Sequence, residues 1–467
     1  MASAARTFAT IGSVEPPTGA PAGLDRVVVL GGSMAGLLAA RVLADHAATV
    51  VAIERDTLTD VVAPRRGVPQ GTQVHALLQA GGRQLERWFP GFDAGARAAG
   101  AQPISPQQWA SYTDGVRKPV APIGDALTAT RPFLEQQVRE RVRELPNVKI
   151  INGRVTGLDF NATEVTGVRY ESDGDGGHEP ADLVVDATGR ASKVSDWLTA
   201  AGWDAPPMTR QITGINYATA FFRRPPGRPD IGAALCALTP AKGGDLAGVA
   251  FSAVENDRWI VMMGGYGTCR PGETAEDLIR RCRQDFPEPF GRAVSHGIIG
   301  DVITYRQADS RRRDWAKAGR LPARLLAVGD AVASFNPIYG QGMSSAALHA
   351  SCLSMFLRSG PDLTAPARPF FDLQQVVVDA AWATSTAGDR ARPSINLPPR
   401  GLERVRASLA GMVVEATTVD PVLALGFAKV TQMIEHPAVL ATPGSLWRAW
   451  RARSVPRPRP VPPLEAA

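Results

Sequence analysis

The sequence predicts an α/β fold, α+β overall, in which a parallel sheet is interrupted by an antiparallel sheet and followed by a helical segment. An apolar strand over Arg26–Leu30, a helix over Met34–Ala44 and a strand over Thr49–Ile53 form a βαβ unit near the start. From Ile212 to Tyr266 the apolar residues alternate with polar ones, which is typical of antiparallel strands. The stretch Gly401–Trp450 has a mostly helical pattern.

The elements between these landmarks alternate between helical and strand patterns. Helical periodicity covers Arg131–Leu145 and starts again near Gly342. The buried strand that begins at Leu325 indicates that the chain returns to the parallel sheet after the antiparallel insertion. The predicted strands outside the βαβ unit are Val148–Ile151, Gly153–Phe160, Glu164–Tyr170, Leu183–Asp186, Tyr217–Phe222, Gly248–Val254, Arg258–Met263 and Leu325–Val328.

Composition and charge exclude several classes of protein. The residues are 44% hydrophobic and 21% charged, which is ordinary for a globular chain. A length of 467 residues is more than one hydrophobic core usually organises. No stretch of about 20 residues stays apolar, so no membrane-spanning helix is predicted. The 51 Lys and Arg residues outnumber the 45 Asp and Glu residues, giving a net charge of +6. They form no dense basic face with interleaved aromatics, so nucleic-acid binding is not expected.

The cysteines, the histidines and the start of the chain indicate a reducing compartment. The four cysteines and six histidines lack the spacing of a metal site, so we expect reduced thiols and no metal. The segment Met1–Asp25 lacks the charged start and apolar core of a secretory signal. These features predict a cytoplasmic protein and leave its oligomeric state open.

The loop between the first strand and the first helix has the composition of a phosphate-binding loop. Gly31 and Gly36 stand where glycines allow a tight turn and close backbone approach to a pyrophosphate, and Gly32, Met34 and Ala35 complete the loop. Ser33 replaces the middle glycine, and we expect its hydroxyl to donate to a phosphate oxygen. Glu54 ends the second strand, where a carboxylate accepts from ribose hydroxyls, and Arg55 follows it. These features together predict a Rossmann-type dinucleotide site.

Two distant segments resemble the flavoprotein monooxygenases with the para-hydroxybenzoate hydroxylase fold. They are Leu325–Ala331 (LLAVGDA) and Asn336–Met343 (NPIYGQGM), and Asp182–Arg190 (DLVVDATGR) resembles the middle motif of that family. The resemblance implies FAD as the cofactor, with Asp330 binding the ribityl chain and Arg131 starting a helix near the flavin. It also implies that Pro337, Gly340, Gly342 and Met343 line the flavin ring.

Within that superfamily the chain is most similar to the flavin epoxidases of polyether-antibiotic biosynthesis. The segments that carry this likeness are Arg66–Leu78 (RGVPQGTQVHALL), Tyr217–Arg223 (YATAFFR), Asp257–Val261 (DRWIV) and Gly329–Met343, and the likeness runs from about Arg26 to about Val439. The resemblance implies O2 as co-substrate and epoxidation of a lipophilic polyketide or terpenoid alkene through a flavin C4a-hydroperoxide, within secondary metabolism. Gln73 and Gln341 depart from the pattern: Gln73 stands where such relatives often have a second histidine, and Gln341 stands at a flavin-side position that can be histidine.

The resemblance divides the chain into an FAD-binding domain, an inserted substrate domain and terminal segments. The predicted segments are a mobile tail over 1–24, the first part of the FAD-binding domain over 25–204, the substrate domain over 205–307, the second part of the FAD-binding domain over 308–400, C-terminal helices over 401–452 and a Pro-rich tail over 453–467.

Several further residues are candidates for the site. His75 is a candidate catalytic residue, with a structural histidine as the alternative interpretation, and Arg66, or its neighbour Arg65, is expected to reach the flavin or its phosphates. Phe222 and Trp259 lie on strands expected over the flavin and are candidates for the substrate pocket. The run Arg311–Arg313 is expected to be a solvated turn or a landing site for a reductase.

Two questions of function stay open at this level: the source of the electrons and the reaction catalysed. The electrons come either from NAD(P)H directly or from a partner flavin reductase, because no second dinucleotide loop is visible. The alternatives to epoxidation are aromatic hydroxylation, reduction of double bonds and the role of a non-redox flavoprotein cyclase. The Trp-x-Trp-x-Ile-Pro signature of flavin halogenases is missing from the sequence. The expected partner is otherwise a small lipophilic substrate.

Overall fold

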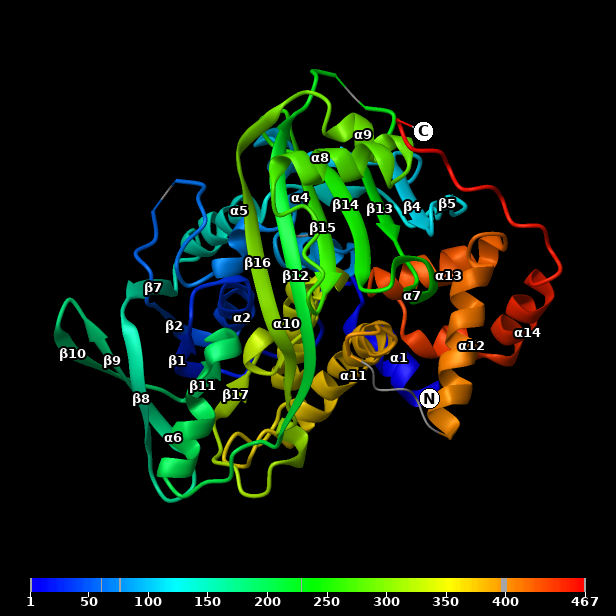
Figure 1. The fold of residues 1–467 in the computed structure, drawn as a ribbon. Helices are drawn as coiled ribbons and strands as arrows, with labels where there is room; N and C mark the ends of the chain where they lie inside the picture. The colour runs from blue at the N-terminus through cyan, green and yellow to red at the C-terminus, as the bar shows by residue number, and fades with distance from the viewer. Residues whose placement is uncertain (1, 60, 75–76, 228, 396–400, 466–467) are drawn as a thin grey trace.

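The computed structural model describes residues 2–59, 61–74, 77–227, 229–395 and 401–465. A five-stranded parallel sheet forms its first layer, with the strand order β17-β11-β1-β2-β7 (Figure 1). The strands read as apolar runs because helices such as α2 (Met34–Ala44), α5 (Arg131–Arg143) and α10 (Gln341–Arg358) cover the sheet. The strands are β1 (Leu24–Leu30), β2 (Ala47–Glu54), β7 (Val148–Asn152), β11 (Leu183–Asp186) and β17 (Leu325–Ala327). The predicted α/β class is confirmed.

The second layer is a mixed eight-stranded sheet in the order β18-β16-β12-β15-β14-β13-β4-β5. Its centre is the predicted antiparallel insertion, and α8 (Ala275–Gln284) and α9 (Glu288–Ala293) pack over one face (Figure 1). The strands are β4 (Trp109–Thr113), β5 (Val116–Arg117), β12 (Met208–Arg223), β13 (Ala233–Ala237), β14 (Leu246–Val254), β15 (Arg258–Tyr266), β16 (Ile298–Arg313) and β18 (Ala333–Ser334). The sheet therefore also takes strands from outside 205–307.

The run Arg311–Arg313 is not the solvated turn that the sequence suggested. It ends β16 and pairs with residues 208–210 of β12. Arg312 and Arg313 are buried, and Arg312 forms ion pairs with Asp314 and with Asp379. These arginines therefore take part in strand pairing and in ion pairs within the chain. The structure does not support a landing site for a reductase at this run.

Smaller elements complete the body of the molecule. A three-stranded antiparallel sheet lies in the order β10-β9-β8, and β3 pairs with β6. The strands are β3 (Gln102–Ile104), β6 (Ala126–Thr128), β8 (Arg154–Phe160), β9 (Val165–Ser172) and β10 (Asp175–Pro180). The short helices are α3 (Gln79–Trp88), α4 (Phe92–Ala98), α6 (Val194–Ala200) and α7 (Pro240–Gly243).

The start of the chain is a helix, which corrects the expected mobile tail over 1–24. Helix α1 spans Ala2–Ile11, and Phe8 and Ile11 are buried in the main core. The Phe8 ring meets the ring of His436 edge-on, with centroids 5.8 Å apart. These two apolar side chains lie one turn apart on one helix face, so their burial explains why the segment is ordered.

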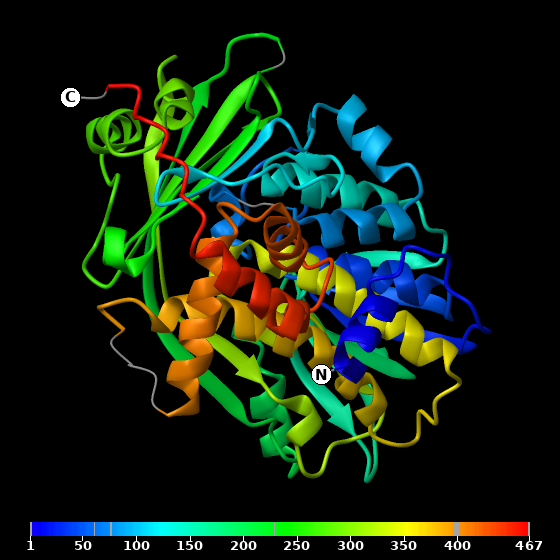
Figure 2. The ribbon, with the colours of Figure 1, turned by 90° about the vertical axis from the view of Figure 1, so that its right-hand side faces the viewer.

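The C-terminal part is helical as predicted and packs on one side of the body (Figure 2). Its helices are α11 (Arg368–Arg390), α12 (Leu402–Ala416), α13 (Pro421–Thr431) and α14 (Pro443–Ala452). The Pro-rich segment after α14 runs in extended form to α9, where the carbonyl of Pro462 accepts from the N–H of Glu288. Among the described residues, no single helix is both long and apolar enough to span a bilayer.

Candidate functional site

The loop after β1 approaches its surroundings as closely as a phosphate cradle requires. Gly31 has a φ of 103°, which favours glycine. A Cβ on Gly36 would lie 1.8 Å from the carbonyl oxygen of Gly31, so only glycine fits there. Helix α2 starts directly after Ser33, and its first N–H groups have no partner within the helix. The loop therefore offers unpaired donors at the positive end of a helix.

Glu54 joins the end of β2 to this loop. Its Oε2 atom accepts from the backbone N–H of Gly32 at 2.6 Å, and its Oε1 atom accepts from the N–H of Asp56 at 3.0 Å. The side chain is buried. Because β1 and β2 pair in parallel up to Leu30 and Ile53, their carboxyl ends meet at one edge and bring Glu54 to the loop.

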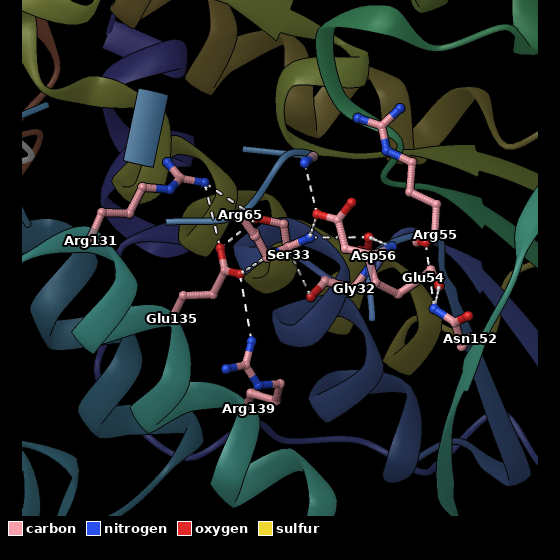
Figure 3. A network of polar contacts seen from close by, with 11 residues as sticks. Gly32, Ser33, Glu54, Arg55, Asp56, Arg65, Arg131, Glu135, Arg139 and Asn152 are labelled. Carbon is pink, nitrogen blue, oxygen red and sulfur yellow. Dashed lines mark hydrogen bonds and ion pairs between the residues drawn. The ribbon is translucent and has the colours of Figure 1, made fainter. Parts of the chain in front are cut away.

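A network of alternating charges lies beside the loop (Figure 3). Arg65 binds three carboxylates: its Nη1 lies 2.8 Å from Asp56 and 3.0 Å from Glu54, and its Nε lies 2.8 Å from Glu135. The Ser33 hydroxyl donates to the other oxygen of Glu135 at 2.7 Å, and Arg131 donates to Ser33 at 3.3 Å. The side chains of α5 thus reach the loop. Arg65, Arg131 and Glu135 also line a cavity of about 180 Å³.

The network refines three sequence predictions. Arg65 lies at the loop, whereas Arg66 is exposed and has no polar partner in the described part of the chain. Arg55 is exposed, although it follows Glu54 directly. The Ser33 hydroxyl is directed to Glu135, so binding a phosphate would require it to exchange that acceptor. His75 lies outside the described residues.

The second end of the site is built around Asp330. This residue lies in a short 3-10 turn after β17, beside Gly189 and Gly342. Burial raises the pKa of its carboxyl, while the charges of Arg131 and Arg190 lower it. Within the described ranges, no donor hydrogen-bonds to this carboxylate. It is therefore available to a ligand hydroxyl.

The segment after Asp330 exposes further backbone donors. Pro337 begins a 3-10 turn, and Gly340 has a φ of 66° immediately before α10. Gly342 is exposed and Met343 is buried in the first turn of α10, whose N–H groups have no partner within the helix. Arg131 links the two ends, since it contacts Ser33 and its charge acts on Asp330.

These features fit a dinucleotide that spans both ends. The loop at Gly31–Gly36 can hold a pyrophosphate, Glu54 can accept from a ribose, and the unpaired carboxylate of Asp330 can accept from a polyol chain. The family model described as "FAD binding domain" matches residues 25–359, which include both ends. The chain belongs to the FAD binding domain family.

The chain is similar to further proteins of known sequence or structure. Protein Rv3254 of Mycobacterium tuberculosis (strain ATCC 25618 / H37Rv) is 34% identical over 351 residues, which cover 72% of this chain and 73% of that protein. The flavoprotein/dehydrogenase of Cytophaga hutchinsonii has a TM-score of 0.65 at 14% identity, covering 92% of this chain and 98% of its own.

Two further solved structures share the fold. The flavin-dependent brominase Bmp2 has a TM-score of 0.62 at 16% identity, covering 92% of this chain and 98% of its own. The p-nitrophenol 4-monooxygenase PnpA of Pseudomonas putida DLL-E4 has a TM-score of 0.59 at 18% identity, covering 89% and 99%. At these identities the likeness shows a common fold, and the predicted FAD-binding fold with its second sheet is confirmed.

One side of the eight-stranded sheet faces the turn after Asp330. Its members are Ile215, Tyr217, Met262 and Tyr266, against which Ile338 of that turn packs. The strand register explains this set, because Ile215 pairs with Tyr266 and Thr219 pairs with Met262. We call this the site side of the sheet.

The predicted pocket residues Phe222 and Trp259 lie on the opposite side. They pair with each other across β12 and β15, one position out of phase with the site side. Both are buried in the core beneath α8 and α9, together with Phe251 and Phe290. The prediction that they line the substrate pocket is wrong, since a one-residue step along a strand reverses the face.

A buried polar network lies behind the same turn and was missed at the sequence level. Oδ1 of Asp389 accepts from the Tyr266 hydroxyl at 2.8 Å, from the Asn336 amide at 2.8 Å and from the Tyr339 hydroxyl at 3.3 Å. The Tyr217 hydroxyl donates to Asn336 at 2.6 Å. Burial raises the pKa of Asp389 to about 6. The network joins the site side of the sheet, the turn after Asp330 and α11.

The two glutamines that depart from the epoxidase pattern both lie at the site. Gln73 accepts from the hydroxyl of Thr219, a residue on the site side of β12, at 2.6 Å. Gln341 begins α10 and is buried, and its Oε1 has no partner in the described part of the chain. Both departures therefore lie near the turn after Asp330 rather than on a distant surface.

Proposed function

We infer that the chain is an FAD-dependent monooxygenase that epoxidises an alkene of a lipophilic natural-product intermediate, of polyketide or terpenoid type. The observation that carries this proposal is the apolar cluster at the turn after Asp330. Ile215 and Met262 contribute to it from the sheet and Ile338 from the turn itself, and the hydroxyls of Tyr217 and Tyr266 form hydrogen bonds within the Asp389 network. FAD, when bound, supplies the redox chemistry that activates O2.

The residues of this chain would bind the cofactor, orient the substrate and exclude water from the site. The loop at Gly31–Gly36 holds the pyrophosphate, and Asp330 fixes the polyol chain between Arg131 and Arg190. The site side of the sheet presents an apolar surface to the substrate, which keeps water from the reacting atoms. An alkene needs little proton transfer from a side chain, so an apolar lining suits epoxidation.

Aromatic hydroxylation is the second candidate, and the Asp389 network favours it. Hydroxylation of a phenol requires loss of the phenolic proton. The hydroxyls of Tyr266 and Tyr339 donate directly to Asp389, a carboxyl with a pKa of about 6. Through either hydroxyl, the Asp389 carboxylate can accept a proton near neutral pH. Solved structures with the same fold include a brominase and a Diels–Alderase, so the fold alone selects no reaction.

The source of electrons has two candidates. Either NAD(P)H binds transiently or a partner flavin reductase delivers reduced flavin. In both cases one atom of O2 enters the substrate and the other leaves as water, with two electrons consumed. We place the enzyme in the cytoplasm, where both reductants are available, and in the biosynthesis of an antibiotic or another secondary metabolite.

The test is labelled-oxygen transfer by the FAD-loaded protein. The protein is photoreduced without oxygen, mixed with 18O2 and offered a lipophilic polyene or a phenol, and the products are analysed by mass spectrometry. A polyene epoxide carrying one 18O atom supports the proposal. Label in the phenol ring alone supports the second candidate. Reoxidation without label in either probe contradicts monooxygenation of both substrate classes.

A further inference from the structure

The C-terminal helices present a row of large apolar side chains to solvent. On α12, Leu402, Val405 and Leu409 are 76%, 55% and 36% exposed, and their spacing puts them on one helix face. On α14, Trp447 and Trp450 are 55% and 62% exposed and lie three residues apart. We call these five residues the C-terminal apolar face.

The exposed residues of α12 continue a stripe of apolar residues that, further along the helix, packs against α14. Further along α12, Val413 and Ala416 pack with Ala449 and Ala452 of α14. The first two turns of α12 extend past this contact (Figure 2). Every side chain described there, from Arg404 to Ala410, is exposed. An isolated helix of this length is marginal in water, so an apolar stripe without a partner among the described residues indicates a binding surface.

Basic residues surround the face. The segment 401–460 holds eight Lys and Arg residues against four Asp and Glu residues, whereas the rest of the chain is almost balanced at 43 against 41. Arg404, Arg406 and Arg453 are exposed and pair with no carboxylate among the described residues. The guanidinium of Arg451 lies over the Trp447 ring, 5.5 Å from its centroid.

Three of the acidic residues in this segment form ion pairs. Asp420 binds Arg448 at 3.0 Å, Glu415 binds Arg457 at 2.7 Å and Glu435 binds Lys429 at 2.7 Å. Among the described side chains of the segment, the charged groups without an oppositely charged partner are therefore arginines.

We propose that the C-terminal apolar face docks the protein on an anionic lipid surface. Leucine and valine would enter the acyl boundary, the two tryptophans would lie at the headgroup level, and the arginines would contact anionic headgroups. In this docking α12 and α13 lie along the surface. Together they are long and apolar enough for a bent span, but a bend of 114° separates Arg404–Ala416 from Pro421–Thr431. A second copy of the chain fits less well, because a two-fold contact would bring identical arginine clusters together.

The test is flotation of the full chain with vesicles of phosphatidylcholine alone or with phosphatidylglycerol added. The wild type should float with the anionic vesicles, and its binding should weaken as salt rises. R404A/R406A should lower the partition coefficient about 25-fold, at about fivefold for each arginine. W447A/W450A should lower it by more than about tenfold.

Matched controls come from exposed residues elsewhere. Ile212→Ala removes an apolar residue that is 76% exposed on β12, and Arg292→Ala removes an exposed arginine on α9. Both should bind vesicles as the wild type does, and thermal unfolding should show that every variant is folded. The proposal is overturned if the wild type stays with the unbound protein, or if the α12 and α14 variants bind like the controls. A vesicle-free dimer that W447A/W450A converts to monomer would assign the face to a second copy instead.

Discussion

The carboxylate of Glu54 holds the backbone N–H of Gly32 at 2.6 Å, so a charge at the end of β2 fixes the loop after β1. The same carboxylate lies 3.0 Å from Arg65, which in turn binds Asp56 and Glu135. One guanidinium therefore ties the loop, the end of β2 and α5 into a single unit. The two adjacent arginines of this segment allow a direct test of that unit.

Replacing Arg65 should destabilise the protein, while replacing its neighbour should not. Arg65→Ala leaves three carboxylates, two of them buried, without their shared cation, which should cost about 3 kcal/mol. Arg66→Ala removes an exposed side chain and should change stability by less than about 0.5 kcal/mol. Thermal unfolding of both apoproteins measures this. Equal melting temperatures would show that the network contributes nothing.

Replacing Ser33 by glycine should weaken FAD binding, although glycine is the usual residue at this position. Ser33 has a φ of −94° in extended backbone, so its Cβ is not strained and glycine relieves nothing. The change removes a hydroxyl bonded to Glu135 and Arg131 and available to a phosphate, which should cost about 1–3 kcal/mol of binding.

Isothermal titration of the Ser33→Gly apoprotein with FAD provides the measurement. Ser33→Thr should also bind more weakly, because its extra methyl group crowds the loop. A Ser33→Gly variant that binds FAD more tightly than the parent would overturn the role of this hydroxyl.

Asp389 should make stability fall as pH rises between about 4 and 6. Its folded pKa of about 6 lies above the ordinary value of 3.8, so the folded chain keeps a proton that the unfolded chain has lost in this window. The carboxyl is neutral below the window, and its ionisation above the window costs up to about 3 kcal/mol. Asp389→Asn keeps an acceptor for Tyr266 and cannot ionise.

The measurement is the melting temperature of wild type and Asp389→Asn from pH 5 to pH 8. The advantage of the variant should grow with pH and level off above about pH 7, while the exposed Asp301→Asn variant should follow the wild type throughout. A constant difference between wild type and Asp389→Asn would show that this carboxyl does not titrate in the folded state.

Local patterns could predict that the loop after β1 lies beside Glu54, because these parts are close in sequence. Gly32 and Glu54 are 22 residues apart, in one βαβ unit whose geometry is fixed by parallel pairing. Asp389 is 123 residues from Tyr266, and its partners come from separate elements, so no spacing rule could bring them together. The same limit applies to α1, whose Phe8 is ordered only by contact with distant helices.

The pocket side of the eight-stranded sheet could not be predicted from alternation alone. Phe222 and Thr219 lie on opposite faces of the same strand, β12, and both are buried. The packing of α8 and α9 decides which face of the sheet meets the turn after Asp330. These two helices cover Phe222 and Trp259 and leave the other face to the turn. If one face of the sheet were exposed to solvent, polar residues in the sequence would distinguish that face from the buried one.

The measurement that tests the account most directly is titration of the apoprotein with FAD in wild type and Asp330→Ala. The account places the cofactor between the Gly31–Gly36 loop and a half-buried carboxylate that has no protein donor among the described residues. Removing that acceptor should cost about 1.5–3 kcal/mol, which raises the FAD dissociation constant roughly ten- to a hundredfold. The exposed control Asp301→Ala should bind as the wild type does. An Asp330→Ala dissociation constant equal to that of the wild type would contradict the proposed site.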